Sequence, residues 1–244
     1  MDNTMYVGLS RQLVLRRQLD VVANNVANVD TVGFKVESLM VQTDVETLPS
    51  GGAAPPRVNF VLDGGVARDF SQGGLKQTGA PLDVAIQGEG FFKVTTPAGE
   101  RYTRGGQFLL DSQGRLVTPS GQPVQGDGGD IVLDPTKGPV KIASDGTISQ
   151  GAATVGKLQV VNFASLSGLS KDGDGLYRND SNLQPQVNPD ASLQQGMIES
   201  SNVNAIAMIT KLIAVQRAYE QISQMVVQAS DLSKTTIDRL GRVS

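Results

Sequence analysis

Apolar residues in the last part of the chain recur at intervals that alternate between four and three. This spacing places them on one face of an α-helix. The stripe consists of Met208, Leu212, Val215, Tyr219, Ile222, Val226 and Ala229. We predict a helix over Val203–Leu240, capped by Ser200, Ser201 or Asn202 and ended by Gly241. At 1.5 Å per residue it would be ~57 Å long.

A shorter stripe with the same spacing lies near the N-terminus and predicts a helix of ~39 Å over Asn3–Asn28. Its members are Leu15, Leu19, Val22, Val26 and Val29. We expect the two terminal helices to pair. The longer helix would extend ~18 Å further, and four flanking residues widen its apolar face: Ile206, Ile209, Ile213 and Met225. We expect another subunit to cover that surface, and an ordinary helical hairpin on a globular core is the alternative.

Turn-forming residues are concentrated between the two predicted helices. All 11 prolines lie between Pro49 and Pro189, and 24 of the 28 glycines lie within residues 51–175. Short β-prone runs alternate with these turns. They cover residues 81–86, 90–96, 107–111, 114–118, 139–143, 147–149 and 157–163. The predicted fold is therefore a mainly β central domain with α-helical N- and C-terminal segments.

The same pattern suggests domain boundaries. Residues 1–34 and 197–244 form the paired terminal helices, and residues 78–196 form the β-rich domain. Residues 35–77, which include the glycine- and proline-rich stretch Ser50–Pro56, are predicted to be an extended connector.

Composition excludes several classes of function. The 244 residues include neither cysteine nor histidine, which removes disulfides, cysteine nucleophiles and histidine-based catalysis or metal binding. The net charge of -3 and the lack of a dense basic run argue against nucleic-acid binding. No apolar stretch is long enough for a membrane span. Residues 1–6 lack the features of a Sec signal peptide, so any export is expected to use another route.

Two short motifs resemble ligand sites but lack essential positions. Lys171–Gly175 resembles the start of a calcium loop, yet leucines occupy later ligand positions at 176 and 183, so we predict a polar turn. Gly88–Gly90 is a fragment of a dinucleotide fingerprint without a following helix, and we interpret it as a hairpin turn.

No other residues indicate catalysis. Nothing in the spacing of Asp83, Glu89 and Glu100 requires them to meet. Phe91, Phe92 and Tyr102 are expected to alternate in a β core. We predict no catalytic residue, no metal ligand and no cofactor.

The segment Ala23–Lys35, ANNVANVDTVGFK, contains three asparagines within five residues, although asparagine is unfavourable inside a helix. We expect Asn24, Asn25 and Asn28 to bond to neighbouring helices, and local capping bonds are the alternative. Gly33 is expected to adopt a left-handed or closely packed conformation, with Phe34 anchoring the turn and Lys35 in solvent.

These residues also carry a resemblance. Leu19–Lys35, LDVVANNVANVDTVGFK, resembles the N-terminal signature of the bacterial flagellar rod and hook proteins. Other segments resemble the central and closing parts of the same family: Thr78–Lys93, Tyr102–Phe108, Asp111–Val124, Gly196–Asn204 and Gln216–Glu220. They occur in the family's order and span almost the whole chain. Residues 6–12 and 60–70 look most like proximal-rod proteins, and a distal-rod protein is the alternative.

The resemblance implies a structural subunit of the basal-body rod that polymerises into a helical, torque-transmitting tube in the periplasm. Its implied partners are copies of itself, other proximal and distal rod subunits, and the flagellar type III export apparatus. The terminal helices would form a coiled-coil (D0-like) layer beside a D1-like β domain. The implied subunit-interface residues are Leu15, Leu19, Val22, Asn24, Asn25, Val26, Asn28, Gly33, Phe34, Met208, Leu212, Val215, Tyr219, Ile222 and Val226. A secreted β-rich binding module, or an enzyme with carboxylates in the middle region, are the alternatives from other classes.

Overall fold

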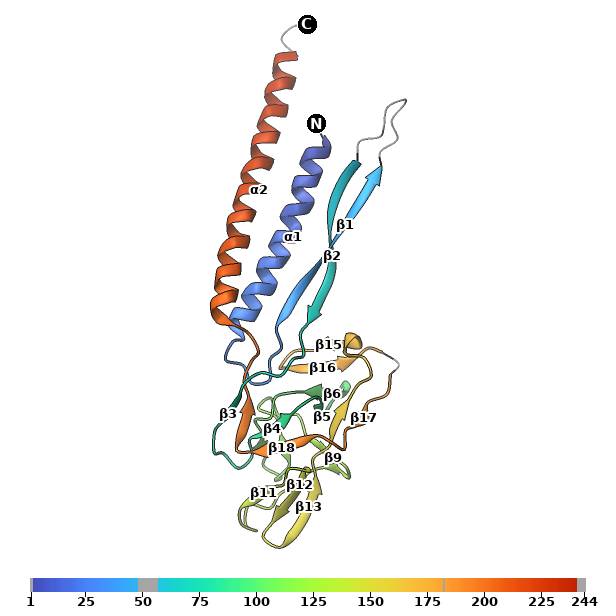
Figure 1. The fold of residues 1–244 in the computed structure, drawn as a ribbon, viewed down its shortest axis with the longest axis vertical. Helices are drawn as coiled ribbons and strands as arrows, with labels where there is room; N and C mark the ends of the chain where they lie inside the picture. Colours follow the sequence, from blue (N-terminus) through green and yellow to red (C-terminus); the bar gives the residue numbers. More distant parts are fainter. Residues whose placement is uncertain (1, 48–56, 182, 241–244) are drawn as a thin grey trace. The chain divides into compact units, whose positions relative to one another are not determined.

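The computed structural model describes residues 2–47, 57–181 and 183–240. The chain divides into two compact units (Figure 1). Unit 1 comprises residues 1–27, 37–69 and 204–244, and unit 2 comprises residues 28–36 and 70–203. The chain therefore passes between the units at four points.

Unit 1 consists of two helices and a β-hairpin. Helix α1 (Asp2–Ala27) lies beside helix α2 (Ala205–Leu240) and beside strands β1 (Glu37–Thr47) and β2 (Arg57–Arg68) (Figure 1). The helices are antiparallel, because Asn25 contacts Met208 while a methyl group at Gly8 would lie 2.8 Å from Val226 Cγ2. Both predicted helices are present, each displaced by no more than two residues at either end. Over the described residues, neither helix combines the length and apolarity that a membrane crossing requires.

Helix α2 is capped by a residue that we did not predict. The Asn204 side-chain oxygen accepts the Ala207 N–H at 3.0 Å. The predicted caps Ser200 and Asn202 are instead bonded within unit 2, where the Ser200 N–H donates to the Gly74 carbonyl and Asn202 bonds to Ser71. The predicted end of the helix at Gly241 lies outside the described residues.

The segment predicted to be an extended connector contains the β1–β2 hairpin. Its strands pair antiparallel from Glu37 with Arg68 to Thr47 with Arg57, with a register shift between Leu39 and Val41. A β-strand and an extended linker can have similar local sequences, because only the strand is paired with another segment. The stretch Ser50–Pro56 lies outside the described residues.

Unit 2 contains a six-stranded antiparallel sheet in the order β15-β16-β6-β5-β14-β17. These strands are β15 (Leu169–Lys171), β16 (Leu176–Asn179), β6 (Gly99–Thr103), β5 (Phe91–Thr96), β14 (Val160–Asn162) and β17 (Gln186–Val187). A three-stranded sheet is formed by β11 (Val140–Ile142), β12 (Thr147–Gln150) and β13 (Ala153–Lys157). A 3₁₀ turn, η1 (Leu166–Gly168), precedes β15.

Four two-stranded pairs complete the described part of unit 2. They are β3 (Leu75–Gln77) with β19 (Met197–Glu199), β4 (Val84–Gln87) with β18 (Ser192–Gln195), β7 (Leu109–Leu110) with β8 (Leu116–Val117), and β9 (Gln125–Gly126) with β10 (Gly129–Asp130). The prediction of a mainly β central region with two terminal helices is confirmed.

Neighbouring residues of strand β5 contribute to two separate cores. Phe92 belongs to a large, mainly aliphatic cluster with Val84 and Ile148, whereas Phe91 belongs to an aromatic cluster with Tyr102 and Tyr177. Successive side chains of a strand point to opposite faces of the sheet, which explains the separation. The expected alternate burial of Phe91, Phe92 and Tyr102 is confirmed.

The two ligand-like motifs are turns. Lys171–Gly175 leads from β15 into β16, as predicted for a polar turn. Gly88–Gly90 joins β4 and β5, which belong to different sheets, so the prediction of a hairpin turn was wrong. The local sequence indicated a turn, but strand pairing depends on partners elsewhere in the chain.

Candidate functional site

Of the three asparagines in Ala23–Lys35, Asn25 is the one that is buried. Its side chain is fully buried in unit 1. Its amide nitrogen donates to the Glu37 carbonyl at 2.7 Å, and its oxygen accepts the Glu37 N–H at 2.9 Å. A carboxamide thus satisfies both backbone groups of one residue without burying a charge. The amide nitrogen also donates to Met208 Sδ of helix α2 at 3.8 Å, so the expected bond to a neighbouring helix is present. The bonds to the start of strand β1 were not predicted.

The other two asparagines behave differently. Asn28 follows helix α1, and its side-chain oxygen accepts the Thr31 hydroxyl at 3.1 Å. The Thr31 N–H also donates to the Asn28 carbonyl, so the local capping alternative describes this residue. Asn24 is exposed to solvent.

Gly33 adopts a conformation that requires glycine. Its φ is +69°, and a methyl group there would lie 2.5 Å from the Arg104 carbonyl carbon and the Gly105 nitrogen. Both expected reasons for glycine, a left-handed backbone and a close approach, therefore apply. The following Phe34 is buried, and the Lys171 ammonium lies 4.6 Å from its ring centroid.

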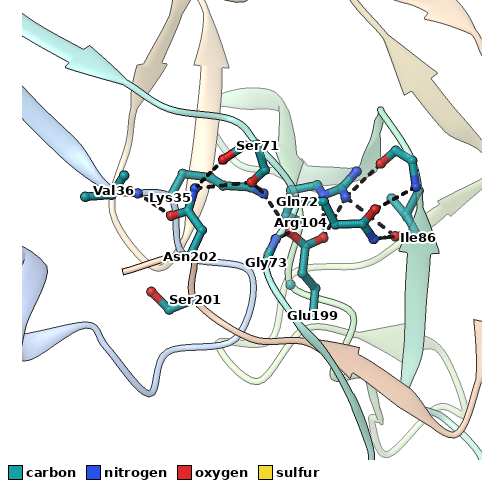
Figure 2. A network of polar contacts seen from close by, with 12 residues as sticks. Lys35, Val36, Ser71, Gln72, Gly73, Ile86, Arg104, Glu199, Ser201 and Asn202 are labelled. Atoms are coloured by element: carbon teal, nitrogen blue, oxygen red, sulfur yellow. Dashed lines mark hydrogen bonds and ion pairs between the residues drawn. The ribbon is translucent and has the colours of Figure 1, made fainter. Parts of the chain in front are cut away.

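Lys35 is buried in unit 2, and the prediction that it stays in solvent was wrong. Its ammonium donates to Glu199 Oε1 and to the Ser71 carbonyl, both at 2.6 Å (Figure 2). Lys35 and Glu199 are each 1% exposed. A lysine after a turn is normally solvated. Glu199, the partner of Lys35, lies 164 residues away in the sequence. No local signal identifies that partner.

Arg104 completes a buried ion cluster, defined here as Lys35, Arg104 and Glu199. Its Nε donates to Glu199 Oε2 at 2.8 Å. The rest of the guanidinium donates to the carbonyls of Gly90 at 2.6 Å and Gly88 at 2.9 Å. Sequence reasoning missed Arg104 and Glu199, although both lie in segments that carry the family resemblance.

Further bonds extend the ion cluster to neighbouring segments (Figure 2). The Asn202 side-chain oxygen accepts the Val36 N–H at 2.8 Å, and its amide donates to the Ser71 carbonyl at 3.2 Å. The Gly73 N–H donates to Glu199 Oε1 at 3.0 Å. The segments around Lys35, Ser71 and Asn202 are therefore held together inside unit 2.

The described residues contain no group of three or more acidic side chains that could hold a metal ion. The acids considered as a possible carboxylate pair have separate partners: Glu100 pairs with Lys93 at 2.6 Å, and Glu89 accepts from Asn162 at 3.5 Å. Burial, with a smaller contribution from the Glu100 carboxylate, raises the pKa of Tyr102 to about 12. This tyrosine is part of the aromatic core.

Comparison with known proteins identifies the family. Three family models match: one for the flagella basal body rod protein over residues 5–35, one for the flagellar hook protein FlgE/F/G D1 domain over 85–150, and one for the flagellar basal body rod FlgEFG protein C-terminal region over 194–239. The flagellar basal-body rod protein FlgF of Caulobacter vibrioides is 51% identical, with 100% of both chains covered. The chain belongs to the flagellar basal-body rod protein family.

Other relatives support the same family. FlgG of Caulobacter vibrioides is 35% identical over 89% of this chain and 92% of the relative. FlgF of Escherichia coli is 32% identical over 95% of both chains. The chain is thus a structural rod subunit that assembles with other rod subunits. The segments matched by the three family models contain Asn25, Lys35, Arg104 and Glu199.

In this rod protein, the apolar stripes predicted from sequence are covered within unit 1. Leu15, Val22 and Val215 are buried. The remaining stripe residues of unit 1 are half-buried: Leu19, Val26, Met208, Leu212, Tyr219, Ile222, Val226 and Ala229. Val29 is also half-buried but belongs to unit 2. Most of the candidate interface residues therefore already have neighbours in their own chain.

The flanking residues of helix α2 are exposed. Ile206 is 80% exposed, Met225 is 60% exposed, and Ile209 and Ile213 are each 47% exposed. Helix α1 has a second exposed apolar set that sequence reasoning missed, comprising Tyr6, Leu9 and Leu13. Their spacing of three and four residues places them on one helix face, which is a signal that the sequence contained.

Proposed function

We propose that this rod subunit is an FlgF-type component of the proximal rod and acts as a structural element, not as an enzyme. It leaves the cytoplasm through the flagellar type III export apparatus without a cleaved Sec signal. In the periplasm its copies and other rod subunits form a helical tube that transmits torque. The terminal helices form a coiled-coil (D0-like) layer in that tube, beside a D1-like β domain.

The identity to two rod proteins of one organism supports the proximal position. The chain is 51% identical to FlgF and 35% identical to FlgG of Caulobacter vibrioides. A complementation experiment tests this assignment. The chain is expressed in a Caulobacter strain that lacks FlgF and in one that lacks FlgG. We expect swimming to return only in the first strain, and rescue of only the second would show a distal-rod protein.

The exposed apolar residues of α2 support assembly through the terminal helices. A soluble monomer gains nothing from isoleucines that face water at Ile206, Ile209 and Ile213, whereas burying each against a neighbour contributes ~1.5–3 kcal/mol. A head-to-tail contact that does not close produces a helical filament. The half-buried and buried stripe residues form the seam inside each subunit, and the flanking residues form the contact between subunits.

A pair of matched double variants tests this contact. Ile206→Glu with Ile213→Glu is expected to abolish rod assembly, observed by electron microscopy of basal bodies, while the purified chain keeps its helical circular dichroism. The control, Val132→Glu with Val155→Glu, adds the same number of glutamates at exposed apolar positions of unit 2. Normal rods in the isoleucine variant would show that this face does not carry the subunit contact.

A further inference from the structure

The buried ion cluster lies close to the places where the chain leaves unit 2. Lys35 comes just before the passage after Val36, and Glu199 precedes the passage after Val203. A third passage, after Asp69, is followed directly by Ser71 and Gly73, which bond to Lys35 and Glu199. The segments that lead into strand β1, out of strand β2 and into helix α2 thus share one set of contacts.

Glu199 is the centre of these contacts. One carboxylate oxygen accepts from Lys35 and from the Gly73 N–H, and the other accepts from Arg104. The Glu199 carbonyl accepts the Gly33 N–H at 2.8 Å. Each of these bonds joins two residues of unit 2, so none of them needs a residue of α1 or α2.

We propose that the ion cluster of Lys35, Arg104 and Glu199 is a preformed anchor for the terminal helices. It fixes the segments 33–36 and 199–203 on the β unit whether or not the helices are folded. The inference concerns the unassembled chain and goes beyond the assignment to the rod.

The physical basis is the cost of rearranging buried charges. Moving the Lys35 or Glu199 segment away would leave a charge in the interior without its partner, which is strongly unfavourable. The backbone of Gly33 packs directly against the backbone of Arg104 and Gly105, which further restricts its path. Most of the stability of a helix in a protein comes from the packing of its apolar face against other elements. Segments fixed in advance reduce the ordering that assembly still requires.

Hydrogen exchange of the purified full-length chain tests the anchor. The double variant Leu15→Asp with Val215→Asp places charges at two buried positions of unit 1 and is expected to unfold the helices. Helix amides should then exchange at the rate of an unfolded chain. The amides of Gly33, Gly73 and Ser200, which donate within unit 2, should keep their protection within tenfold. Loss of protection at these amides together with the helices would overturn the proposal.

A second variant tests whether the charge of Glu199 carries the effect. Glu199→Gln in the otherwise unchanged chain is expected to lower the protection of the Gly33 and Gly73 amides at least tenfold. The control is Glu100→Gln, because Glu100 also pairs with a lysine at 2.6 Å but is 53% exposed. Glu100→Gln should change the protection of the same amides less than twofold. Equal effects of the two variants would show that the cluster is not an anchor.

If Glu199→Gln unfolds the whole β unit, Lys35→Met takes its place, because it leaves the Arg104–Glu199 pair intact. It should also lower protection at Gly33 at least tenfold, and unchanged protection would contradict the proposal. None of these measurements requires a rod, so their failure leaves the assignment to the rod unaffected. Loss of rod assembly in the isoleucine variant, in turn, says nothing about the anchor.

Discussion

At the scale of single residues, the opening motif combines two different uses of polar or small side chains. Asn25 satisfies both backbone groups of Glu37, and Gly33 allows two backbones to meet. The role of Asn25 requires a donor and an acceptor on one side chain, and the role of Gly33 requires the absence of a side chain.

Replacing Asn25 should destabilise unit 1. Asn25→Ala leaves the Glu37 N–H and carbonyl without their partner, and we expect a loss of about 2–4 kcal/mol. The control is Gln224→Ala at an exposed position of helix α2, which should change stability by less than about 1 kcal/mol. Urea unfolding followed by helical circular dichroism measures both. Equal losses would contradict the role assigned to Asn25.

Alanine substitutions at Gly33 and Gly79 distinguish the cost of backbone strain from the cost of steric overlap. The φ angles of these glycines are +69° and +73°, but a methyl group at Gly79 would meet nothing within 4 Å. Gly79→Ala should therefore cost about 1–2 kcal/mol for the left-handed conformation alone. Gly33→Ala should cost about 1–3 kcal/mol more than Gly79→Ala, because neighbouring atoms must move to remove the overlap. Thermal unfolding of unit 2 gives both values, and similar losses would exclude the close approach as a cause.

At the scale of elements, burial divides each terminal helix into an inner and an outer face. The inner face of α2 carries the heptad stripe, and the outer face carries exposed isoleucines. The residues with heptad spacing therefore make contacts inside the subunit, whereas the residues that widen the apolar face are exposed on its surface. The six-stranded sheet is divided in a similar way by the alternation of Phe91 and Phe92.

The two faces of α2 should respond differently to truncation in the monomer. Val215→Ala removes buried methyl groups and should lower the stability of unit 1 by about 1–3 kcal/mol. Ile206→Ala at an 80% exposed position should change it by less than about 0.5 kcal/mol. Denaturant unfolding of the two variants provides the comparison. A large loss at Ile206 would show that this side chain is covered in the monomer.

The aromatic core predicts a loss of stability at high pH. The pKa of Tyr102 is raised to about 12 from 10.0, so the folded chain keeps this proton while the unfolded chain loses it. Stability is fully present below pH ~10 and falls by about 2–3 kcal/mol as the pH rises towards 12. Tyr102→Phe should make the stability curve flatter in this range. An equally steep curve in the variant would assign the loss to other groups.

At the scale of the whole molecule, two units with separate cores are joined by four passages of the chain. The described helices longer than one turn belong to unit 1, whereas the aromatic cluster belongs to unit 2. The helical signal in far-ultraviolet circular dichroism therefore reports on unit 1, and the near-ultraviolet signal of the packed aromatic cluster reports mainly on unit 2. This separation makes it possible to assign the effect of a substitution to one of them.

The two units should unfold in separable transitions. Asn25→Ala should lower the midpoint of the helical signal, and Gly33→Ala should lower the midpoint of the aromatic signal, because each contact lies inside one unit. The opposite signal should move by less than about 2 °C, which corresponds to under 1 kcal/mol for a domain of this size. Parallel shifts of both signals would indicate one cooperative structure.

Local patterns in the sequence were sufficient to locate several elements. Heptad spacing located α1 and α2 within two residues, turn residues located Gly33 and the Lys171–Gly175 turn, and the ordered family segments indicated a rod protein. Which distant residues meet depends on the tertiary structure. It paired Lys35 with Glu199 across 164 residues, gave Asn25 a strand as its partner, and turned the expected connector into the β1–β2 hairpin. Periodicity indicates which face of an element is apolar. It does not indicate which distant residue pairs with a buried charge or which strand pairs with an exposed strand edge.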